Sequence, residues 1–208
     1  MDPEEEEEKE NIKIILIGNE GVGKTNLINV ASGREFNENE KSSLTASYLK
    51  KEVMINGENY ILSLWDTIGQ EKLRTLSKLF FKNSKIVIYV YDITNKDTFN
   101  GLESWDADVK EMLGNDIIKG LVGNKQDLFL KEEVSEDEAN KYAKTLNAKF
   151  RLTSAKKDPG GFSNFLEDLL KDYLNKSEKK QDDNIMDDSI KIKKKKKKEE
   201  KNDKFSCC

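Results

Sequence analysis

The sequence contains no histidine, and its only two cysteines, Cys207 and Cys208, are adjacent at the C-terminus. Without histidine the chain has no imidazole for acid–base catalysis or for holding a metal ion. Two neighbouring cysteines leave the fold without a disulfide framework, as expected in a reducing compartment. The sequence also lacks the roughly 20 apolar residues of a membrane span and an apolar secretory segment at its N-terminus. These absences exclude His-dependent catalysis and predict a chain without a secretory signal.

Charge is concentrated at the two ends of the sequence. Residues 1–10 carry seven acids and one lysine, a net charge of −6, whereas residues 176–208 carry twelve lysines and eight acids, a net charge of +4. Residues 11–175 are therefore nearly neutral, at −2 of the total −4. Neither end has enough apolar side chains to offset the entropy of ordering it. We expect disordered ends, 1–10 and 176–208, on either side of one domain, 11–175.

Apolar runs alternate with segments of helical periodicity along this central part. The runs predict six strands, of which two flank the turn dipeptide Asn56-Gly57, and residues 34–47 lack periodicity and are expected to form a loop. Such alternation predicts an α/β fold with a mostly parallel six-stranded sheet, one antiparallel edge strand and helices on both faces. The expected strands are Ile12–Ile17, Lys50–Ile55, Tyr60–Trp65, Lys85–Tyr91, Ile118–Gly123 and Lys149–Thr153, and the expected helices are Lys24–Ala31, Leu102–Leu113, Glu136–Leu146 and Phe162–Leu174.

The segment Gly18–Thr25 matches the phosphate-loop pattern G-x-x-x-x-G-K-[ST] between a strand and a helix. Its glycines let the backbone wrap closely and point N–H groups at phosphate oxygens, and the helix that follows adds its positive dipole end. Lys24 is expected to reach the outer phosphates, and the Thr25 hydroxyl to bind Mg²⁺. A glycine turn that binds nothing is the alternative, which the four fixed positions in eight disfavour. The motif predicts a P-loop NTPase but leaves the nucleotide open.

Asn124-Lys125-Gln126-Asp127 follows another expected strand. The Asp127 carboxylate could accept hydrogen bonds from the N1–H and 2-amino groups of guanine, which adenine does not offer. Because the carboxyl ends of parallel strands share one edge of the sheet, this segment should lie near the phosphate loop. The pair of motifs favours guanine nucleotides over those of a P-loop ATPase or kinase.

Together these segments resemble a small GTPase of the Ras superfamily, and specifically of the Rab family, over about residues 11–175 and the last two residues. The Rab character rests on Lys72–Leu76, Phe80–Ser84, Tyr89–Thr94 and the terminal cysteine pair, besides the shared superfamily segments Trp65–Glu71 and Thr153–Lys156. The resemblance implies a GTP/GDP switch that hydrolyses GTP slowly and recruits effectors to membranes in vesicle trafficking. The nucleotide-binding residues that it implies are Gly18, Asn19, Glu20, Gly21, Val22, Gly23, Lys24, Thr25, Asn26, Phe36, Gly69, Asn124, Lys125, Asp127, Ser154, Ala155 and Lys156.

The resemblance also implies a role for several of these residues. Phe36 would pack against the guanine, and Ser154, Ala155 and Lys156 would complete the base pocket. The backbone N–H of Gly69 would sense the γ-phosphate. Asp66 would hold Mg²⁺ through water, beside the direct ligand Thr25.

The family has a switch I hydroxyl that meets Mg²⁺ when GTP is bound. A register without gaps between Gly18 and Trp65 puts Ser43 at that position, whereas the more obvious Thr45 requires an insertion and a compensating deletion. We expect Ser43 to be this ligand, with the alternatives that Thr45 takes the role or that both hydroxyls face solvent.

Gln70 stands where the family has the glutamine that orients the attacking water. Slow hydrolysis that depends on an activating protein is therefore expected. Ile68 replaces the usual alanine beside the γ-phosphate, and Glu20 replaces a small residue, so the alternative is a nucleotide-binding, lipid-anchored scaffold with little or no GTPase activity.

The basic run Lys191–Lys198 alone could be a solvated tail or a nucleic-acid or nuclear-import patch. With Cys207 and Cys208 at the end, the resemblance implies double geranylgeranylation, since two lipid chains hold a protein at a membrane where one does not. We therefore expect a cytoplasmic face of an intracellular membrane, with cycling to the cytosol by a prenyl-binding chaperone, and no nucleic-acid partner. Exchange factors, activating proteins and effectors are the other expected partners, at an apolar patch made of Leu73, Leu76, Leu79, Phe80 and Phe81.

Overall fold

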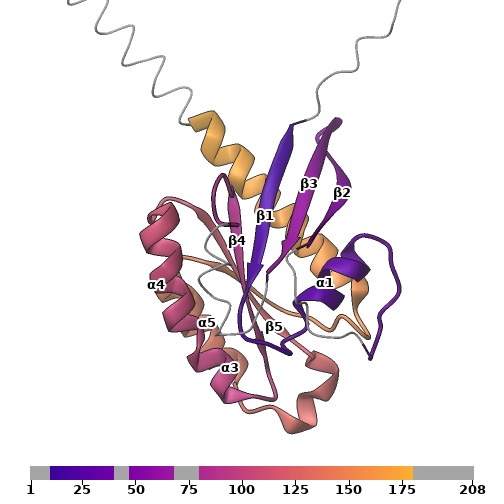
Figure 1. The fold of residues 1–208 in the computed structure, drawn as a ribbon, viewed down its shortest axis with the longest axis vertical. Helices are drawn as coiled ribbons and strands as arrows, with labels where there is room; N and C mark the ends of the chain where they lie inside the picture. Colours follow the sequence, from indigo (N-terminus) through magenta and orange to yellow (C-terminus); the bar gives the residue numbers. More distant parts are fainter. Residues whose placement is uncertain (1–9, 40–46, 68–79, 180–208) are drawn as a thin grey trace, which may run out of the picture. The chain divides into compact units, whose positions relative to one another are not determined.

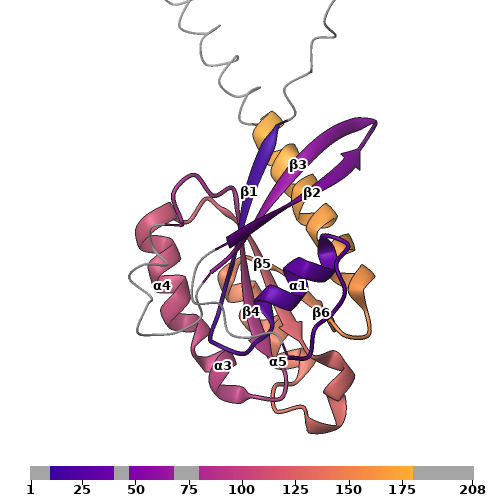
Figure 2. The ribbon, with the colours of Figure 1, turned by 45° about the vertical axis from the view of Figure 1, so that its right-hand side comes forward.

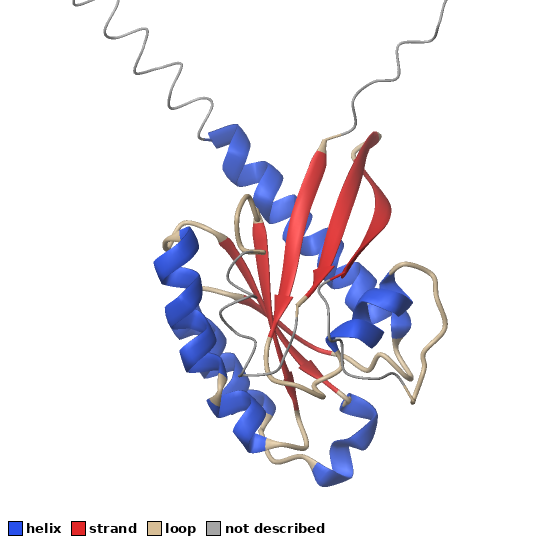
Figure 3. Ribbon diagram, viewed as in Figure 1, coloured by secondary structure: helices blue, strands red, loops and turns tan. Residues whose placement is uncertain are grey.

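The computed structural model describes residues 10–39, 47–67 and 80–179, and its secondary structure is shown in Figure 3. Six strands form one sheet in the order β2-β3-β1-β4-β5-β6. Among the described strands only β2 and β3 pair in antiparallel fashion, and every other neighbouring pair is parallel. The predicted mostly parallel sheet with one antiparallel edge strand is confirmed. The strands are β1 (Asn11–Ile17), β2 (Ser47–Ile55), β3 (Glu58–Asp66), β4 (Ile86–Asp92), β5 (Ile118–Asn124) and β6 (Lys149–Leu152).

The hairpin between β2 and β3 is set by Asn56 and Gly57. Both residues have positive φ, 54° and 87°, as a two-residue turn requires to match the twist of its strands. This turn fixes the register in which Ser47 lies opposite Asp66. The hairpin therefore returns the chain to the edge of the sheet where the candidate site lies.

Helices cover both faces of the sheet (Figures 1 and 2). The described helices are α1 (Lys24–Ala31), α3 (Lys96–Asn100), α4 (Leu102–Leu113), α5 (Glu136–Leu146), the 3-10 helix η2 (Gln126–Lys131) and a helix over residues 159–179, whose part up to Leu170 belongs to the same compact unit as the sheet. Side chains fix the start of two of them: Asn95 accepts a hydrogen bond from the N–H of Asp97 before α3, and Ser135 accepts one from the N–H of Glu138 before α5. None of the helices in the described ranges is long and apolar enough to cross a membrane.

The alternation of side chains along the strands divides the core into two layers. On one face Ile15, Val87 and Tyr89 belong to a buried cluster with Trp105 of α4 and Ala143 of α5. On the other face, a Cβ atom on Gly120 of β5 would come within 2.9 Å of Phe165 and Leu169 in the helix that begins at residue 159. Glycine at this position lets that helix pack closely on the sheet.

Three details differ from the sequence-based expectations. Strand β2 begins at Ser47, inside the segment expected to be loop, because pairing with β3 continues as far as Asp66. Helices α3 and η2 were not expected, since one or two turns carry too little periodicity to be recognised. The last helix begins at residue 159, before the apolar stripe that starts at Phe162.

The described chain divides into two compact units. The unit that carries the sheet extends to Leu170. Within the second unit, Ser177 Oγ donates to the carbonyl of Leu174 at 2.8 Å.

Candidate nucleotide-binding site

The carboxyl ends of the parallel strands bring the predicted motifs to one edge of the sheet. Gly18 follows β1, Asp66 ends β3 and Asn124 ends β5. This edge is where ligands bind in open α/β sheets. The two motifs identified in the sequence therefore belong to one site, joined by the contacts described below.

The phosphate loop adopts a backbone that its glycines make possible. Gly18, Gly21 and Gly23 have φ angles of 142°, 77° and 94°. A Cβ on Gly18 would lie 2.1 Å from the carbonyl oxygen of Val90, and one on Gly23 would lie 2.4 Å from Nδ2 of Asn124. Gly18 and Gly23 are thus required by close packing as well as by backbone conformation, whereas Gly21 has open space around it.

Lys24 is folded into the loop that precedes it. Its ammonium group donates to the carbonyl oxygens of Gly18 and Asn19, at 2.9 Å each, and the residue is only 6% exposed. Burial lowers the pKa of Lys24 to about 8, although the negative charges of Asp66 and Glu20 act in the opposite direction. Because Lys24 forms no direct ion pair with a described carboxylate, its positive charge is available to an anion that enters the loop.

Thr25 and Asp66 form the candidate metal site. The Thr25 hydroxyl donates to Oδ2 of Asp66 at 2.7 Å, and Asp66 is 2% exposed. The next residue, Thr67, anchors the end of β3 by donating to the carbonyl oxygen of Leu16 at 2.5 Å. A hydroxyl and a carboxylate are the hard oxygen donors that Mg²⁺ prefers, so these residues fit the expected ion. Within the described ranges there is no cluster of three His, Cys, Asp or Glu side chains that would suit a different metal.

Asn124 ties the phosphate loop to the loop after β6. Its Nδ2 donates to the carbonyl of Val22 at 2.8 Å, and its Oδ1 accepts from the N–H of Ala155 at 3.2 Å. The side chain is 2% exposed. Asn124 therefore acts on a nucleotide by holding two loops together, and its amide is already occupied by these contacts.

Asp127 is oriented by its neighbour across the site. Ser154 Oγ donates to Oδ1 of Asp127 at 2.5 Å and accepts from the N–H of Lys157 at 3.0 Å. The backbone N–H of Gln126 donates to the carbonyl of Thr153, which keeps the two loops in register. With Oδ1 held in this way, the carboxylate is positioned to accept further hydrogen bonds on its Oδ2 side.

Lys125 has a left-handed backbone conformation, with φ 66°. Its ammonium lies 2.6 Å from Oδ2 of Asp92, while the other carboxylate oxygen of Asp92 accepts from the N–H of Thr94 at 2.9 Å. Asp92 ends β4, between the strands that carry the two motifs. The Lys125 side chain is thereby held over this edge of the sheet.

Phe36 and Lys156 lie next to each other beside the base motif. The Lys156 ammonium is 5.9 Å from the centre of the Phe36 ring and 3.0 Å from Oε1 of Glu38. Asn26 in α1 holds this segment by donating to the carbonyl of Asn37 at 2.9 Å and accepting from its N–H at 3.0 Å. Asn26 thus contributes by fixing the loop that carries Phe36.

Several predicted residues lie outside the described part of the chain: Ser43, Thr45, Ile68, Gly69, Gln70, Leu73, Leu76, Leu79, Cys207 and Cys208. Glu20 is described and is exposed. Of the expected apolar patch, Phe81 is fully buried in the core cluster. Phe80 instead packs on Trp65, which in turn stacks on the exposed Tyr48. Phe80 is therefore the described member of the expected patch that lies outside the core, and it forms an aromatic strip with Trp65 and Tyr48.

Sequence reasoning missed two contacts of helix α4, one with the site and one with the strands that it covers. Trp105 Nε1 donates to Oδ1 of Asn19 in the phosphate loop at 3.2 Å. One turn of α4 also buries Asp106, which accepts from the Tyr89 hydroxyl at 2.7 Å and from Lys119 Nζ at 2.9 Å. The signal for the second contact was an acid on the apolar face of an expected helix, together with a lysine inside an expected strand.

A phosphate loop, a buried lysine, and a base loop tied to it by Asn124 define a P-loop nucleotide-binding protein. Comparison with known proteins then places it more narrowly. The model of the Ras family matches residues 13–175. Ras-related protein Rab-21 of Geodia cydonium is 40% identical over 162 residues, 78% of this chain and 70% of the relative. Rab-21 of Homo sapiens is 40% identical over 161 residues, 77% and 71% of the two chains. Ras-related protein Rab-8 of Diplobatis ommata is 32% identical over 178 residues, 86% and 84% of the two chains.

The chain belongs to the Ras family and is a Rab-type small GTPase. It binds GTP and GDP and hydrolyses GTP to GDP and phosphate.

Proposed function

We propose that this GTPase recruits effector proteins to an intracellular membrane in vesicle trafficking while GTP is bound, and releases them after hydrolysis. The observation that supports a switch is the pairing of Ser47 with Asp66 at the open end of the hairpin. The two switch segments that the resemblance implies are residues 38–48 and 66–82, so the first includes Ser47 and the second begins at Asp66. Both segments are thus attached where the metal site lies, so that loss of the γ-phosphate would affect both.

The phosphate groups are bound by backbone N–H groups of the loop from Gly18 to Thr25 and by the Lys24 ammonium. Mg²⁺, when bound, would supply positive charge that neutralises the phosphates. Thr25 would hold it directly, Asp66 would hold it through water, and Ser43 would join them only in the GTP state. Ser43→Ala should therefore speed GTP release more than GDP release, whereas Thr45→Ala should leave both rates close to the parent's. The opposite pattern would assign the ligand to Thr45.

The base is selected by Asp127, with Lys125 and Phe36 lining the remaining sides. Oδ1 of Asp127 is held by Ser154, so the carboxylate presents an acceptor edge to the N1–H and 2-amino groups of guanine. Asp127→Asn puts an amide donor into that edge, and this suits xanthine, which has a carbonyl in place of the 2-amino group. The test is competitive binding of GDP and xanthosine diphosphate to the parent and the variant. An unchanged preference for GDP in Asp127→Asn would refute the assignment.

Hydrolysis proceeds by positioning, with Gln70 orienting the attacking water, and an activating protein accelerates it. The alternative to a switch is a GTPase so slow that the protein acts as a nucleotide-bound scaffold, suggested by Ile68 at the neighbouring position. Single-turnover hydrolysis separates the two functions. Gln70→Leu should abolish stimulated hydrolysis and raise the GTP-bound fraction in cells if the protein switches, and should change neither if it is a scaffold.

Membrane attachment is proposed to result from geranylgeranylation of Cys207 and Cys208, assisted by the basic run Lys191–Lys198 facing anionic lipid. Two lipid chains permit stable attachment, and removal by a prenyl-binding chaperone permits cycling through the cytosol. Localisation of the tagged parent and of Cys207→Ser/Cys208→Ser tests this proposal. Equal membrane fractions for the two proteins would contradict a lipid anchor at these cysteines.

A further inference from the structure

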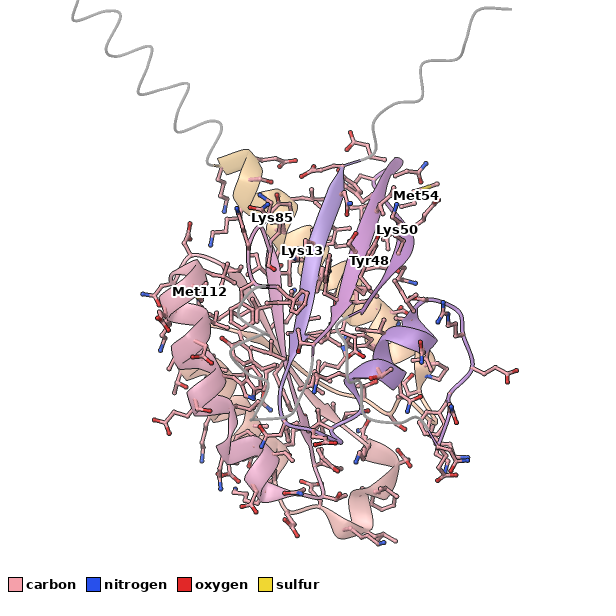
Figure 4. The ribbon with its side chains drawn as sticks, viewed as in Figure 1. Lys13, Tyr48, Lys50, Met54, Lys85 and Met112 are labelled. Carbon is pink, nitrogen blue, oxygen red and sulfur yellow. The ribbon has the colours of Figure 1, made fainter. Side chains whose placement is uncertain are left out.

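The face of the sheet that carries Tyr48 also carries a row of lysines. Lys50 lies opposite Ser63 in the β2–β3 pair, and Ser63 lies opposite Lys13 in the β3–β1 pair. The N–H of Lys85, just before β4, donates to the carbonyl of Lys13 at 2.9 Å. Lys50, Lys13 and Lys85 therefore follow one another across the sheet, and Figure 4 shows their side chains on the same face.

This lysine row has little acidic compensation. Neither Lys50 nor Lys85, both exposed, forms an ion pair within the described ranges. Lys13 is held over the Trp65 ring, with its ammonium 4.3 Å from the ring centre, and donates to the carbonyl of Lys82 at 3.0 Å. Glu52 is the one acid on this face of β2, two residues beyond Lys50, and β3 and β1 add no acid to the face. Lys13 and Lys85 therefore give these strand positions an excess of positive charge.

Apolar side chains border the row. Tyr48 is 49% exposed and Met54 is 66% exposed, and both share the Lys50 face of β2 (Figure 4). An exposed surface that combines apolar side chains with unpaired charge of one sign is suited to a segment of the opposite charge.

We propose that the lysine row binds the acidic N-terminal arm of the same chain, residues 1–9. The arm and Glu10 together carry a net charge of −6, with Glu4 to Glu8 consecutive. The carbonyl of Glu10 accepts from the N–H of Ile61 at 3.1 Å, so the arm leaves the sheet three residues before Lys13. The acidic arm therefore leaves the sheet beside the lysine row, whose charge is opposite to its own.

Length and tethering make the arm a suitable occupant. Nine extended residues reach about 30 Å. Three strand spacings, from β2 to β4, amount to about 14 Å. A tether this short keeps the arm at an effective concentration in the millimolar range, so that several weak surface ion pairs suffice for binding. The bound arm covers Tyr48 and thereby part of the aromatic strip.

The test is paramagnetic relaxation in the GDP-bound full-length chain, with a nitroxide on Pro3→Cys, which leaves the charge of the arm unchanged, in a Cys207→Ser/Cys208→Ser background. The amide signals of Lys13, Tyr48, Lys50 and Lys85 should lose at least half of their intensity at low salt. They should recover at 1 M salt, where the Debye length falls to about 3 Å. Lys50→Gln/Lys85→Gln should restore the signals at low salt.

The matched control is Lys141→Gln/Lys144→Gln, which removes two exposed lysines from α5 and should leave the broadening unchanged. Equal recovery in both variants would show that net charge alone is responsible and would overturn the proposal. Broadening of the Lys191–Lys198 region in place of the sheet would show that the arm pairs with the C-terminal tail. Absence of broadening at low salt would also refute the inference.

Discussion

The buried lysine of the phosphate loop should make nucleotide affinity depend on pH near neutrality. In the empty site, burial lowers the pKa of Lys24 to about 8 from the usual 10.5. Bound phosphate oxygens favour the ammonium form, so the nucleotide complex retains the proton well above that value. Binding above pH 8 therefore requires the uptake of a proton, and GDP affinity must fall as the pH rises through 8.

The size of this effect follows from the pKa of the empty site. About a tenth of the empty sites have a neutral Lys24 at pH 7, and about nine-tenths at pH 9. GDP should therefore bind about tenfold more weakly at pH 9 than at pH 7, a change of about 1.4 kcal/mol. Lys24→Met binds more weakly at every pH but lacks this titrating group.

The assay is GDP affinity by competition with a fluorescent analogue at constant free Mg²⁺, in half-unit steps from pH 7 to pH 9. Any ionisation of guanine itself affects the parent and Lys24→Met equally, so the ratio of the two dissociation constants isolates Lys24. The dissociation constant of Lys24→Met divided by that of the parent should fall about tenfold between pH 7 and pH 9. A ratio that stays constant would show that the lysine either keeps its proton in the empty site or does not bind phosphate.

Three further predictions concern packing and the base loop. Lys119→Met leaves the buried Asp106 carboxylate short of a partner and should lower the free energy of unfolding by about 3 kcal/mol in urea titrations, whereas Lys119→Met/Asp106→Leu should recover most of the loss. Gly18→Ala forces a Cβ against a strand carbonyl and should cost at least about 2 kcal/mol more than Gly33→Ala, a glycine of positive φ with open space around it. Ser154→Ala removes the hydrogen bond that orients the Asp127 carboxylate and should weaken GDP binding about tenfold, as measured by calorimetry. Because weaker binding lowers the stabilisation by ligand, a melting temperature in excess GDP equal to that of the parent would argue against this role of Ser154.

Much of the fold was predictable because its signals are local. The apolar runs, the Asn56-Gly57 turn and the spacing of glycines around Lys24 each determine the conformation of a few neighbouring residues. Long, periodic helices such as α4 and α5 were found at the expected bounds. The start of β2 at Ser47 was missed because it depends on pairing with a strand that follows in the sequence, not on its own composition.

The site was predictable in composition but not in its internal contacts. The sequence identified Asn124 and Asp127 by their motif, yet the structure shows that the first joins two loops while the second is oriented by Ser154. These roles depend on hydrogen bonds between residues that are far apart in the sequence, by 27 positions for Asp127 and Ser154 and by 102 positions for Asn124 and Val22. The buried group of Asp106 and Lys119 had a visible signal, since each places a charge where an apolar side chain is expected, but only the folded sheet shows that they pair.

The bond between Trp105 and Asn19 gives the protein an internal optical reporter. The indole is 2% exposed and shares its N–H with the loop that surrounds the phosphates, while the chain has only one other tryptophan, Trp65. Emission from Trp105 should therefore respond when the phosphate loop fills or empties. With Trp65→Phe to remove the second fluorophore, nucleotide exchange could be followed in real time on the natural, unlabelled nucleotides.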